Sequence, residues 1–259
     1  MNGEEQVYAE ERQAQIVEWA RANGRVEVAH LADELAVTPE TIRRDLTSLE
    51  RRGLLRRVHG GAIPLERLGF EPGLAARASV MTAEKERIAK AALDELPEEG
   101  SILLDAGTTT AQLAALLPRD RELTVVTNAL DIAVRLASQP NLTVLALGGR
   151  LRGRTLAAVD VWAIETLRST FVDVAFMATN GISVERGLTT PDPTEAAVKQ
   201  AMIAAARRAV LIADHTKVGN DHLVRFADLA DIDTFITDAQ VDDGLLAELQ
   251  SNGLEVVCA

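Results

Sequence analysis

Apolar residues near the start of the chain recur at a helical spacing. The pattern predicts three helices, at residues 10–22, 28–35 and 39–52. In the third helix, Ile42, Leu46 and Leu49 stand at i, i+4 and i+7 and therefore share one inner face. Thr38 is a good N-cap for this helix, and Pro39 occupies its first position, where a missing N–H costs nothing. The second and third helices, joined by a tight turn, predict a helix-turn-helix.

A basic extended segment follows the third helix. Gly53 ends that helix, residues 54–58 are predicted to form a strand with basic side chains, and His59-Gly60-Gly61 closes a hairpin, or wing. The outer helix face and the wing carry side chains suited to bases in the major groove and to phosphates. The candidate DNA-binding residues are Thr38, Thr41, Arg43, Arg44, Thr47, Ser48, Arg51, Arg56, Arg57 and His59. The simpler alternative is a solvated helix whose arginines pair with acids such as Asp45.

From Thr82 onward the pattern changes to short apolar runs that alternate with helices. Strands are predicted at 101–105, 123–127, 143–147, 172–178, 209–213, 234–237 and 255–257. Helices are predicted at 82–96, 109–117, 130–138, 160–168, 194–207 and 242–252, and residues 181–195 are expected to form a long loop. Near-continuous apolar strands separated by helices are typical of a mainly parallel sheet covered on both faces. The predicted fold class is an α/β domain with a small N-terminal winged helix-turn-helix.

The stretch between these two patterns, residues 62–80, has two prolines, two glycines and no sustained period. This composition predicts a linker or a loosely packed arm. We therefore expect a winged helix-turn-helix at residues 1–61, a linker at 62–80 and an α/β domain at 81–259.

The distribution of charge along the chain bears on DNA binding. The net charge is −12, which disfavours nucleic acid as a partner, but only −2 of it falls in residues 1–61. Residues 39–59 carry six arginines against three acids, a local charge of +3. A short basic block on a predicted helix-turn-helix in an otherwise acidic chain favours DNA binding.

Composition indicates a cytoplasmic protein. The chain is 47% hydrophobic but only 3% aromatic, and no apolar run approaches the roughly 20 residues that a membrane helix needs. The acidic start lacks the basic-then-apolar layout of a signal peptide. The single cysteine, Cys258, rules out an internal disulfide framework.

Polar residues follow the predicted strands of the α/β domain. Ligands of open α/β sheets bind beyond the carboxyl ends of the strands, near helix N-termini. Backbone amides, hydroxyls and cations there suit a phosphate, whereas carboxylates and amide side chains suit sugar hydroxyls. The candidate ligand-binding residues are Asp105, Gly107, Thr108, Thr109, Thr110, Asn128, Gly148, Gly149, Arg150, Arg152, Asn180, Gly181, Glu195 and Lys217. Together they predict a pocket for a polyol phosphate.

Each of these features has a simpler explanation. The threonines after Asp105 could only cap a helix, and Glu195 and Lys199, at i and i+4, could form a surface ion pair. The histidines show no metal-ligand spacing, and no nucleotide-binding or nucleophile-elbow motif is present. We therefore expect no metal and no cofactor.

Two groups of motifs resemble one known family. TIRRDL and GLLRRVHGGA, within residues 11–62, closely resemble the DNA-binding domain of DeoR-family bacterial transcriptional regulators. LDAGTTT, LTVVTNALDIA, LGGRLR, GLTTPDPTEAAVKQAMI and DHTKVG occur in the order expected of that family's sensor domain. The resemblance covers nearly the whole chain. It departs at Asn180, where many relatives have Asp, and at Ala76, where many have Glu.

The resemblance implies a sensor domain related in fold to ribose-5-phosphate isomerase and CoA-transferases, with a phosphorylated sugar as effector. Residues 81–259 would then be the effector-binding sensor. It implies effector contacts at Asp105, Gly107, Thr108 and Thr109, with Gly148, Gly149, Asn180, Gly181, Glu195 and Lys217 as further candidates. Fructose 1-phosphate or a related sugar phosphate is the suggested effector.

Three functions are open at this point. The leading one is a repressor of a sugar uptake or catabolism operon, relieved by a phosphorylated sugar, that binds double-stranded operator DNA as a homo-oligomer, a dimer or tetramer. The second is a sugar-phosphate isomerase with a DNA-binding appendage, using Glu195 or Asp105 as its base. The third is a structural DNA-binding protein whose α/β domain only oligomerises.

Overall fold

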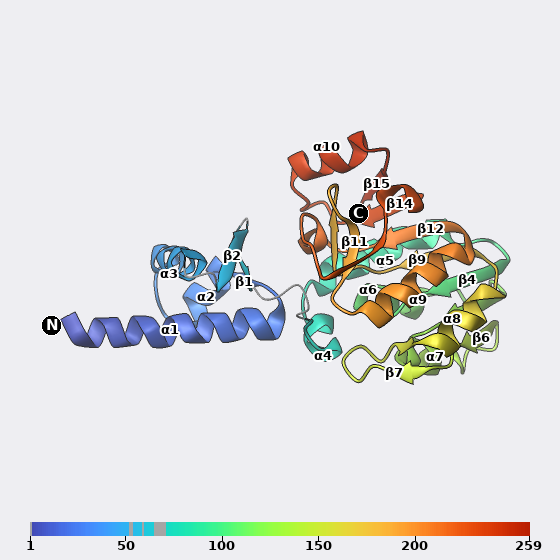
Figure 1. The fold of residues 1–259 in the computed structure, drawn as a ribbon, viewed down its shortest axis with the longest axis horizontal. Coiled ribbons are helices and arrows are strands. Elements are labelled where there is room, and N and C mark those ends of the chain that lie inside the picture. Colours follow the sequence, from blue (N-terminus) through green and yellow to red (C-terminus); the bar gives the residue numbers. More distant parts are fainter. Residues whose placement is uncertain (1, 52–53, 59, 65–70) are drawn as a thin grey trace. The chain divides into compact units, whose positions relative to one another are not determined.

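The computed structural model describes residues 2–51, 54–58, 60–64 and 71–259 (Figure 1). The chain divides into two compact units, an N-terminal unit of residues 1–80 and a C-terminal unit of residues 81–259. Within the described residues, no helix combines the length and apolar composition needed to cross a bilayer.

The N-terminal unit contains the predicted winged helix-turn-helix. Its elements are α1 (Asn2–Asn23), β1 (Val26–Glu27), α2 (Val28–Glu34), α3 (Pro39–Arg51), β2 (Leu55–Val58), β3 (Gly61–Pro64) and α4 (Leu74–Ala78). The strands form an antiparallel sheet in the order β1-β3-β2. The core comes from the periodic apolar positions, among them Ile16, Leu31, Ile42, Leu46 and Leu49. The three predicted helices and the strand after them are confirmed.

Two boundaries of this unit differ from those expected. Helix α1 begins at Asn2 rather than at residue 10, because Glu, Gln and Ala favour a helix even where no apolar stripe marks one. Strand β3 continues to Pro64, into residues that the sequence pattern assigns to the linker. The linker also contains α4. Nη1 of Arg77, in this helix, lies 3.4 Å from Glu71 Oε1. Residues 65–70 lie outside the described part of the chain.

The C-terminal unit is organised around a seven-stranded sheet in which every pairing is parallel. Its strand order is β15-β14-β12-β9-β4-β5-β6. The strands are β4 (Gly100–Leu104), β5 (Leu123–Thr127), β6 (Leu142–Ala146), β9 (Val172–Met177), β12 (Ala206–Ile212), β14 (Thr234–Thr237) and β15 (Glu255–Cys258). These are the seven predicted strands, so the α/β prediction is confirmed.

Helices cover both faces of this sheet, as strands that are apolar on both sides require. One face packs on α5 (Thr82–Ala92), α6 (Thr108–Leu116) and α7 (Leu130–Leu136). The other packs on α8 (Val161–Arg168), α9 (Pro193–Ala204) and α10 (Asp243–Ser251). Successive strand residues alternate between the two cores: Leu104 belongs to the first and Leu103 to the second.

The expected long loop at residues 181–195 is wrong. It contains β10 (Gly181–Ser183) and β11 (Gly187–Thr190), which form an antiparallel sheet with β13 (Val224–Ala227). Short strands rich in Gly, Ser and Thr have the composition of a loop, and pairing with a distant strand stabilises them. A second small hairpin joins β7 (Arg150–Leu151) to β8 (Ala158–Val159), and single turns η1 (Leu93–Glu95), η2 (His215–Lys217) and η3 (Leu229–Asp231) complete the unit.

Candidate DNA interface and effector site

Helix α3 is capped and anchored as its sequence predicts. The Thr38 hydroxyl accepts a hydrogen bond from the Thr41 N–H at 3.2 Å, which is the N-cap interaction. Ile42, Leu46 and Leu49 are buried in the core of the N-terminal unit. The opposite face of the helix is therefore left for contact with a partner.

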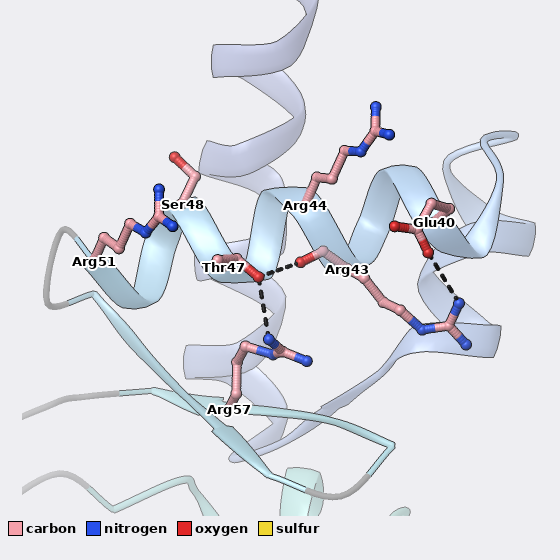
Figure 2. Close-up of a pocket in the computed structure, with 7 residues that line it drawn as sticks. All are labelled: Glu40, Arg43, Arg44, Thr47, Ser48, Arg51 and Arg57. Carbon is pink, nitrogen blue, oxygen red and sulfur yellow. Dashed lines mark hydrogen bonds and ion pairs between the residues drawn. The ribbon is translucent and has the colours of Figure 1, made fainter.

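An open groove of about 570 Å³ lies on that face (Figure 2). Residues of α3 and β2 line it: Glu40, Arg43, Arg44, Thr47, Ser48, Arg51 and Arg57. Six of these seven are candidate DNA-binding residues, so the structure brings them together. Thr38 and Thr41 lie at the start of the same helix, Arg56 is exposed on β2, and His59 lies outside the described residues.

Arg57 ties the wing to α3 through two hydrogen bonds. Its backbone N–H donates to Glu50 Oε1 at 2.9 Å, and its Nη1 donates to Thr47 Oγ1 at 3.2 Å. Thr47 Oγ1 donates in turn to the Arg43 carbonyl oxygen at 2.8 Å. Figure 2 shows the Arg57 side chain reaching across to the helix. These bonds hold the basic side chain of the wing against one edge of the groove.

The arginines of the groove differ in how far their charge is already paired. Arg43 Nη1 lies 3.4 Å from Glu40 Oε2, and both side chains are exposed. The guanidinium groups of Arg44 and Arg51 have neither a hydrogen-bond nor an ion-pair partner among the described residues. An exposed guanidinium of this kind can bind a guanine edge or a phosphate without first losing a protein partner.

Asp45 does not neutralise the arginines of its own helix. It is buried, and its carboxylate accepts hydrogen bonds from Arg12 Nε at 2.6 Å and from Gln13 Nε2 at 2.8 Å. Both donors belong to α1. The alternative in which Asp45 pairs with nearby arginines of α3 is therefore wrong, and the positive face of that helix keeps its charge.

In the C-terminal unit, Asp105 is fully buried directly after β4. Its Oδ2 accepts hydrogen bonds from Lys199 Nζ of α9 and from the Ala178 N–H at 3.0 Å. Lys199 Nζ also donates to the Ala178 carbonyl oxygen at 2.9 Å. Burial raises the pKa of the Asp105 carboxyl, and the ammonium of Lys199 opposes that rise. Asp105 Oδ1 is buried with no hydrogen-bond partner in the described part of the chain.

The turn after Asp105 leads into α6 at an N-terminus without a side-chain cap. Gly107 is the N-cap residue, and none of the threonines bonds the first-turn N–H groups. Thr110 Oγ1 instead donates to the Gly107 carbonyl oxygen at 2.8 Å. Thr109 and Thr110 are buried and Thr108 is half-buried. The capping alternative for this turn is therefore wrong, and the N–H groups stay available to an anion.

Glu195 and Arg152 meet at the start of α9. Asp192 caps that helix by accepting from the Thr194 and Glu195 N–H groups at 2.9 and 3.0 Å. Glu195 Oε1 accepts from Arg152 Nη1 at 2.5 Å and from Thr155 Oγ1 at 2.6 Å. Arg152 Nε lies 3.2 Å from Asp192 Oδ2. These contacts attach the β7–β8 hairpin to α9.

A surface ion pair between Glu195 and Lys199 does not form. Both residues are buried, and they pair with Arg152 and Asp105 respectively. Helical spacing correctly predicts that Glu195 and Lys199 share one face of α9. It does not predict that this face lies against the carboxyl end of β4. Lys199, which the spacing alone assigned to the surface, thus lies against the predicted site residue Asp105.

The remaining candidates have mainly structural contacts. Asn128 Oδ1 accepts from the Ala106 N–H at 3.0 Å, which joins the end of β5 to the turn after β4. Arg150 Nε pairs with Asp160 Oδ2 at 2.7 Å on the exposed hairpin. Asn180 Oδ1 accepts from Thr190 Oγ1 at 3.2 Å.

Gly149 is required for backbone reasons. Its φ is +140°, and a Cβ there would lie 2.4 Å from the Val159 carbonyl oxygen. Gly148 has open space around it, whereas a Cβ at Gly181 would lie 2.2 Å from the Asn220 carbonyl oxygen. Gly149 and Gly181 thus allow close approach of backbone segments.

Two buried aspartates follow β12 and β14: Asp214, which lies in the predicted DHTKVG motif but is not among the candidate ligand-binding residues, and Asp238, which was not identified from the sequence. Burial acts to raise the pKa of Asp214, but the charge of Lys217 and a hydrogen bond from Thr216 hold it below its usual value. Burial acts in the same way on Asp238, and hydrogen bonds from His215 hold its pKa low. His215 Nδ1 lies 2.8 Å from Asp238 Oδ1. Lys217, a predicted site residue, lies in η2 between these groups.

The depressed pKa of Asp238 predicts how stability depends on pH. A carboxyl whose pKa is lower in the folded state stabilises the fold above its unfolded pKa of about 3.9, and loses that contribution as pH falls through the folded value. We expect the free energy of unfolding of the wild type to fall in acid. In Asp238→Asn it should fall less, because the titrating carboxyl is gone. This variant should also be about 1.5–3 kcal/mol less stable than the wild type near neutral pH. Urea titrations from neutral to acid pH measure this. The exposed Asp120→Asn should follow the wild type, and an identical acid profile in Asp238→Asn would contradict the assignment.

Two family profiles match the chain: the DeoR-like helix-turn-helix domain over residues 12–67, and the DeoR C-terminal sensor domain over residues 80–239. The chain belongs to the DeoR family. This DeoR-family chain is 40% identical over 247 residues to the HTH-type transcriptional regulator GlpR of Haloferax volcanii, with 95% of this chain and 96% of the relative covered. It is 34% identical over 231 residues to the transcriptional repressor AccR of Agrobacterium fabrum, with 89% and 90% covered.

Among solved structures, the DeoR-family chain is similar to ribose 5-phosphate isomerase A of Methanocaldococcus jannaschii. The identity is 14% and the TM-score 0.40, with 53% of this chain and 54% of that chain covered. The family predicted from the motifs is confirmed by the profiles and the relatives. The relatives are named as regulators of transcription, and the DeoR-family chain carries the family's DNA-binding helix-turn-helix domain.

Proposed function

We propose that this regulator represses an operon for the uptake or catabolism of a sugar, and that a phosphorylated sugar relieves the repression. One observation carries the proposal. The unpartnered Oδ1 of buried Asp105 lies directly before the uncapped N-terminus of α6. A buried carboxylate oxygen without a partner is costly unless a ligand donates to it.

Each half of such a ligand has a matching group. The N–H groups at the start of α6 suit a phosphate, because the helix dipole and the free donors both favour an anion. Asp105 Oδ1 suits a sugar hydroxyl, which can donate to it. We propose the remaining predicted residues around these two groups as the wall of the pocket, with Lys199 added to them. Fructose 1-phosphate is the first candidate to test.

Repression would then depend on two arrangements of an oligomer. In one, two copies hold their α3 helices at the spacing of operator half-sites. The effector would release the DNA only if it binds the other arrangement more tightly. We propose residues 1–61 as the DNA-binding domain, 62–80 as the linker and 81–259 as the sensor.

An isomerase reaction has less support. A general base must be free to take a proton from the substrate. Glu195 already accepts hydrogen bonds from Arg152 and Thr155, and Asp105 is held by Lys199. We expect no interconversion of ketose and aldose phosphates.

A thermal-shift panel of sugar phosphates tests the effector. One compound should stabilise the protein, by about 2.7 kcal/mol at 100 times its Kd, and should release DNA in fluorescence anisotropy. Flat curves throughout would favour a structural DNA-binding protein without a sensor function. Failure to bind any duplex would reject the regulator itself.

Gly107→Ala tests where the effector binds. A Cβ at Gly107 would lie 2.8 Å from Ala178 Cβ and 3.0 Å from Thr110 Oγ1, so the turn must shift. We expect the variant to bind the effector at least about 10-fold more weakly, a loss of about 1.4 kcal/mol, while its DNA affinity stays unchanged. Gly73→Ala, where a Cβ meets nothing within 4 Å, is the matched control. Effector binding at wild-type strength in Gly107→Ala would place the ligand elsewhere.

A further inference from the structure

Large exposed apolar side chains gather in one part of the C-terminal unit. Nine such side chains occur among the described residues, and six of them lie within residues 130–162. We call these six the edge patch: Leu130, Val134, Leu145, Leu151, Val161 and Trp162. Trp162 is 73% exposed and Val134 is 69% exposed. Exposed apolar side chains gathered on neighbouring elements, here around one edge of the sheet, point to an interaction surface.

The edge patch surrounds an open sheet edge. Strand β6 is the last strand of the seven-stranded sheet, and none of the described strands pairs with its outer side. Its sequence, LTVLA, contains no charge, no proline and no bulge. Leu142 and Val144 pack into the core beneath α7, whereas Leu145 points the other way and is 50% exposed. Edges of monomeric sheets are normally protected by charge, proline or a covering segment.

The other members of the patch lie on elements close to this edge. Helix α7 contacts β6 directly. The Leu130 N–H donates to the Leu156 carbonyl oxygen at 3.1 Å, and Ala129 forms a bridge with Ala157, so the start of α7 lies against the β7–β8 hairpin. Helix α8 follows that hairpin and begins with Val161 and Trp162. Figure 1 shows α7, α8, β6 and β7 at the same side of the C-terminal unit.

We propose that a second copy of this chain docks on the edge patch, with the two β6 strands paired antiparallel about a two-fold axis. Two identical edge strands related by such an axis are antiparallel, which gives the open N–H and C=O groups their partners. The apolar side chains on α7 and α8 would then cover the two faces of the joint sheet. The interface is thus self-complementary in hydrogen bonding and in apolar contact.

Charge favours a second copy over other occupants. At the rim of the patch, Arg150 and Asp160 pair with each other at 2.7 Å, so this part of the rim presents no excess of one sign that would repel an identical copy. Residues 62–259 have a net charge of −10, which disfavours nucleic acid on this unit. A regulator with one recognition helix per chain also reads only one half-site, and a second copy supplies the other.

The test is the oligomeric state of the full-length chain. Light scattering after size exclusion, at micromolar concentration, should show a dimer or a multiple of one for the wild type. Trp162→Glu and Leu145→Lys should each weaken self-association by about 30-fold or more, because each puts a charge into the patch. Phe171→Glu, an 80% exposed position outside the patch, should behave as the wild type. Circular dichroism checks that each variant is folded.

Hydrogen exchange gives a second measurement that does not depend on a variant. The β6 amides that point away from β5 should be protected in the concentrated protein and should exchange faster on dilution, whereas β4 amides in the middle of the sheet should not change. A monomeric wild type, an unchanged oligomer in both patch variants, or equal dissociation by Phe171→Glu would each overturn the proposal. So would β6 amides that exchange at the same rate at every concentration.

Discussion

Lys199→Met is expected to lower the free energy of unfolding of the C-terminal unit by about 3–5 kcal/mol, because it leaves the buried Asp105 carboxylate without its counter-charge. Lys199 is 3% exposed and Asp105 is fully buried, so the pair is shielded from solvent in the folded protein. The variant also loses the bond to the Ala178 carbonyl oxygen and the position of the ammonium 5.3 Å from the Phe226 ring centroid. Urea titration followed by circular dichroism measures the loss.

A second substitution separates charge from packing. In the double variant Lys199→Met, Asp105→Asn no charge is buried, so most of the lost stability should return. The loss should also depend on pH. Burial raises the pKa of Asp105 and Lys199 opposes that rise, so removing Lys199 should raise the pKa further. The stability lost in Lys199→Met relative to the wild type should therefore shrink as pH falls towards that pKa. A loss under about 1 kcal/mol, or no recovery in the double variant, would contradict a buried charge pair.

This pair also shows why the sequence predicted the site only in part. Asp105 was identified because it follows a strand, and the carboxyl ends of parallel strands meet at one edge whatever their order. Its partner is 94 residues away, on a helix whose own pattern does not say which strand it covers. The same reason hid Asp238, whose burial depends on how neighbouring turns pack.

The fold was more predictable because local patterns determine most of it. Apolar runs marked all seven strands of the parallel sheet, because the inner strands are largely buried on both faces and the edge strands β6 and β15 still carry apolar side chains. Strands β10 and β11 have Gly, Ser and Thr at positions where an apolar residue would have signalled a strand. They are stabilised as strands because β11 pairs with β13, which is distant in the sequence. The local sequence pattern therefore does not predict them.

Arg44→Ala is expected to weaken binding to the preferred operator by about 1–3 kcal/mol and to relax discrimination at the base pair that Arg44 contacts. The reason is its place in the groove. Arg44 projects from the exposed face of α3, and its guanidinium has no protein partner among the described residues. Anisotropy titrations measure this with an operator selected from a random duplex pool and with its single-base variants.

Arg57→Ala should act differently, because Arg57 belongs to the wing. Its backbone N–H keeps the bond to Glu50, so the wing stays in place while the cation is lost. Binding to all duplexes should then weaken alike, and the slope of log affinity against log salt should shrink by about 1. Arg119→Ala, at an exposed position in the C-terminal unit, should leave both quantities unchanged. A base contact changes the ratio of the affinities for specific and non-specific DNA, whereas a phosphate contact does not. Equal effects of Arg44→Ala and Arg57→Ala on both kinds of DNA would therefore refute the assignment of Arg44 to base recognition and of Arg57 to phosphate binding.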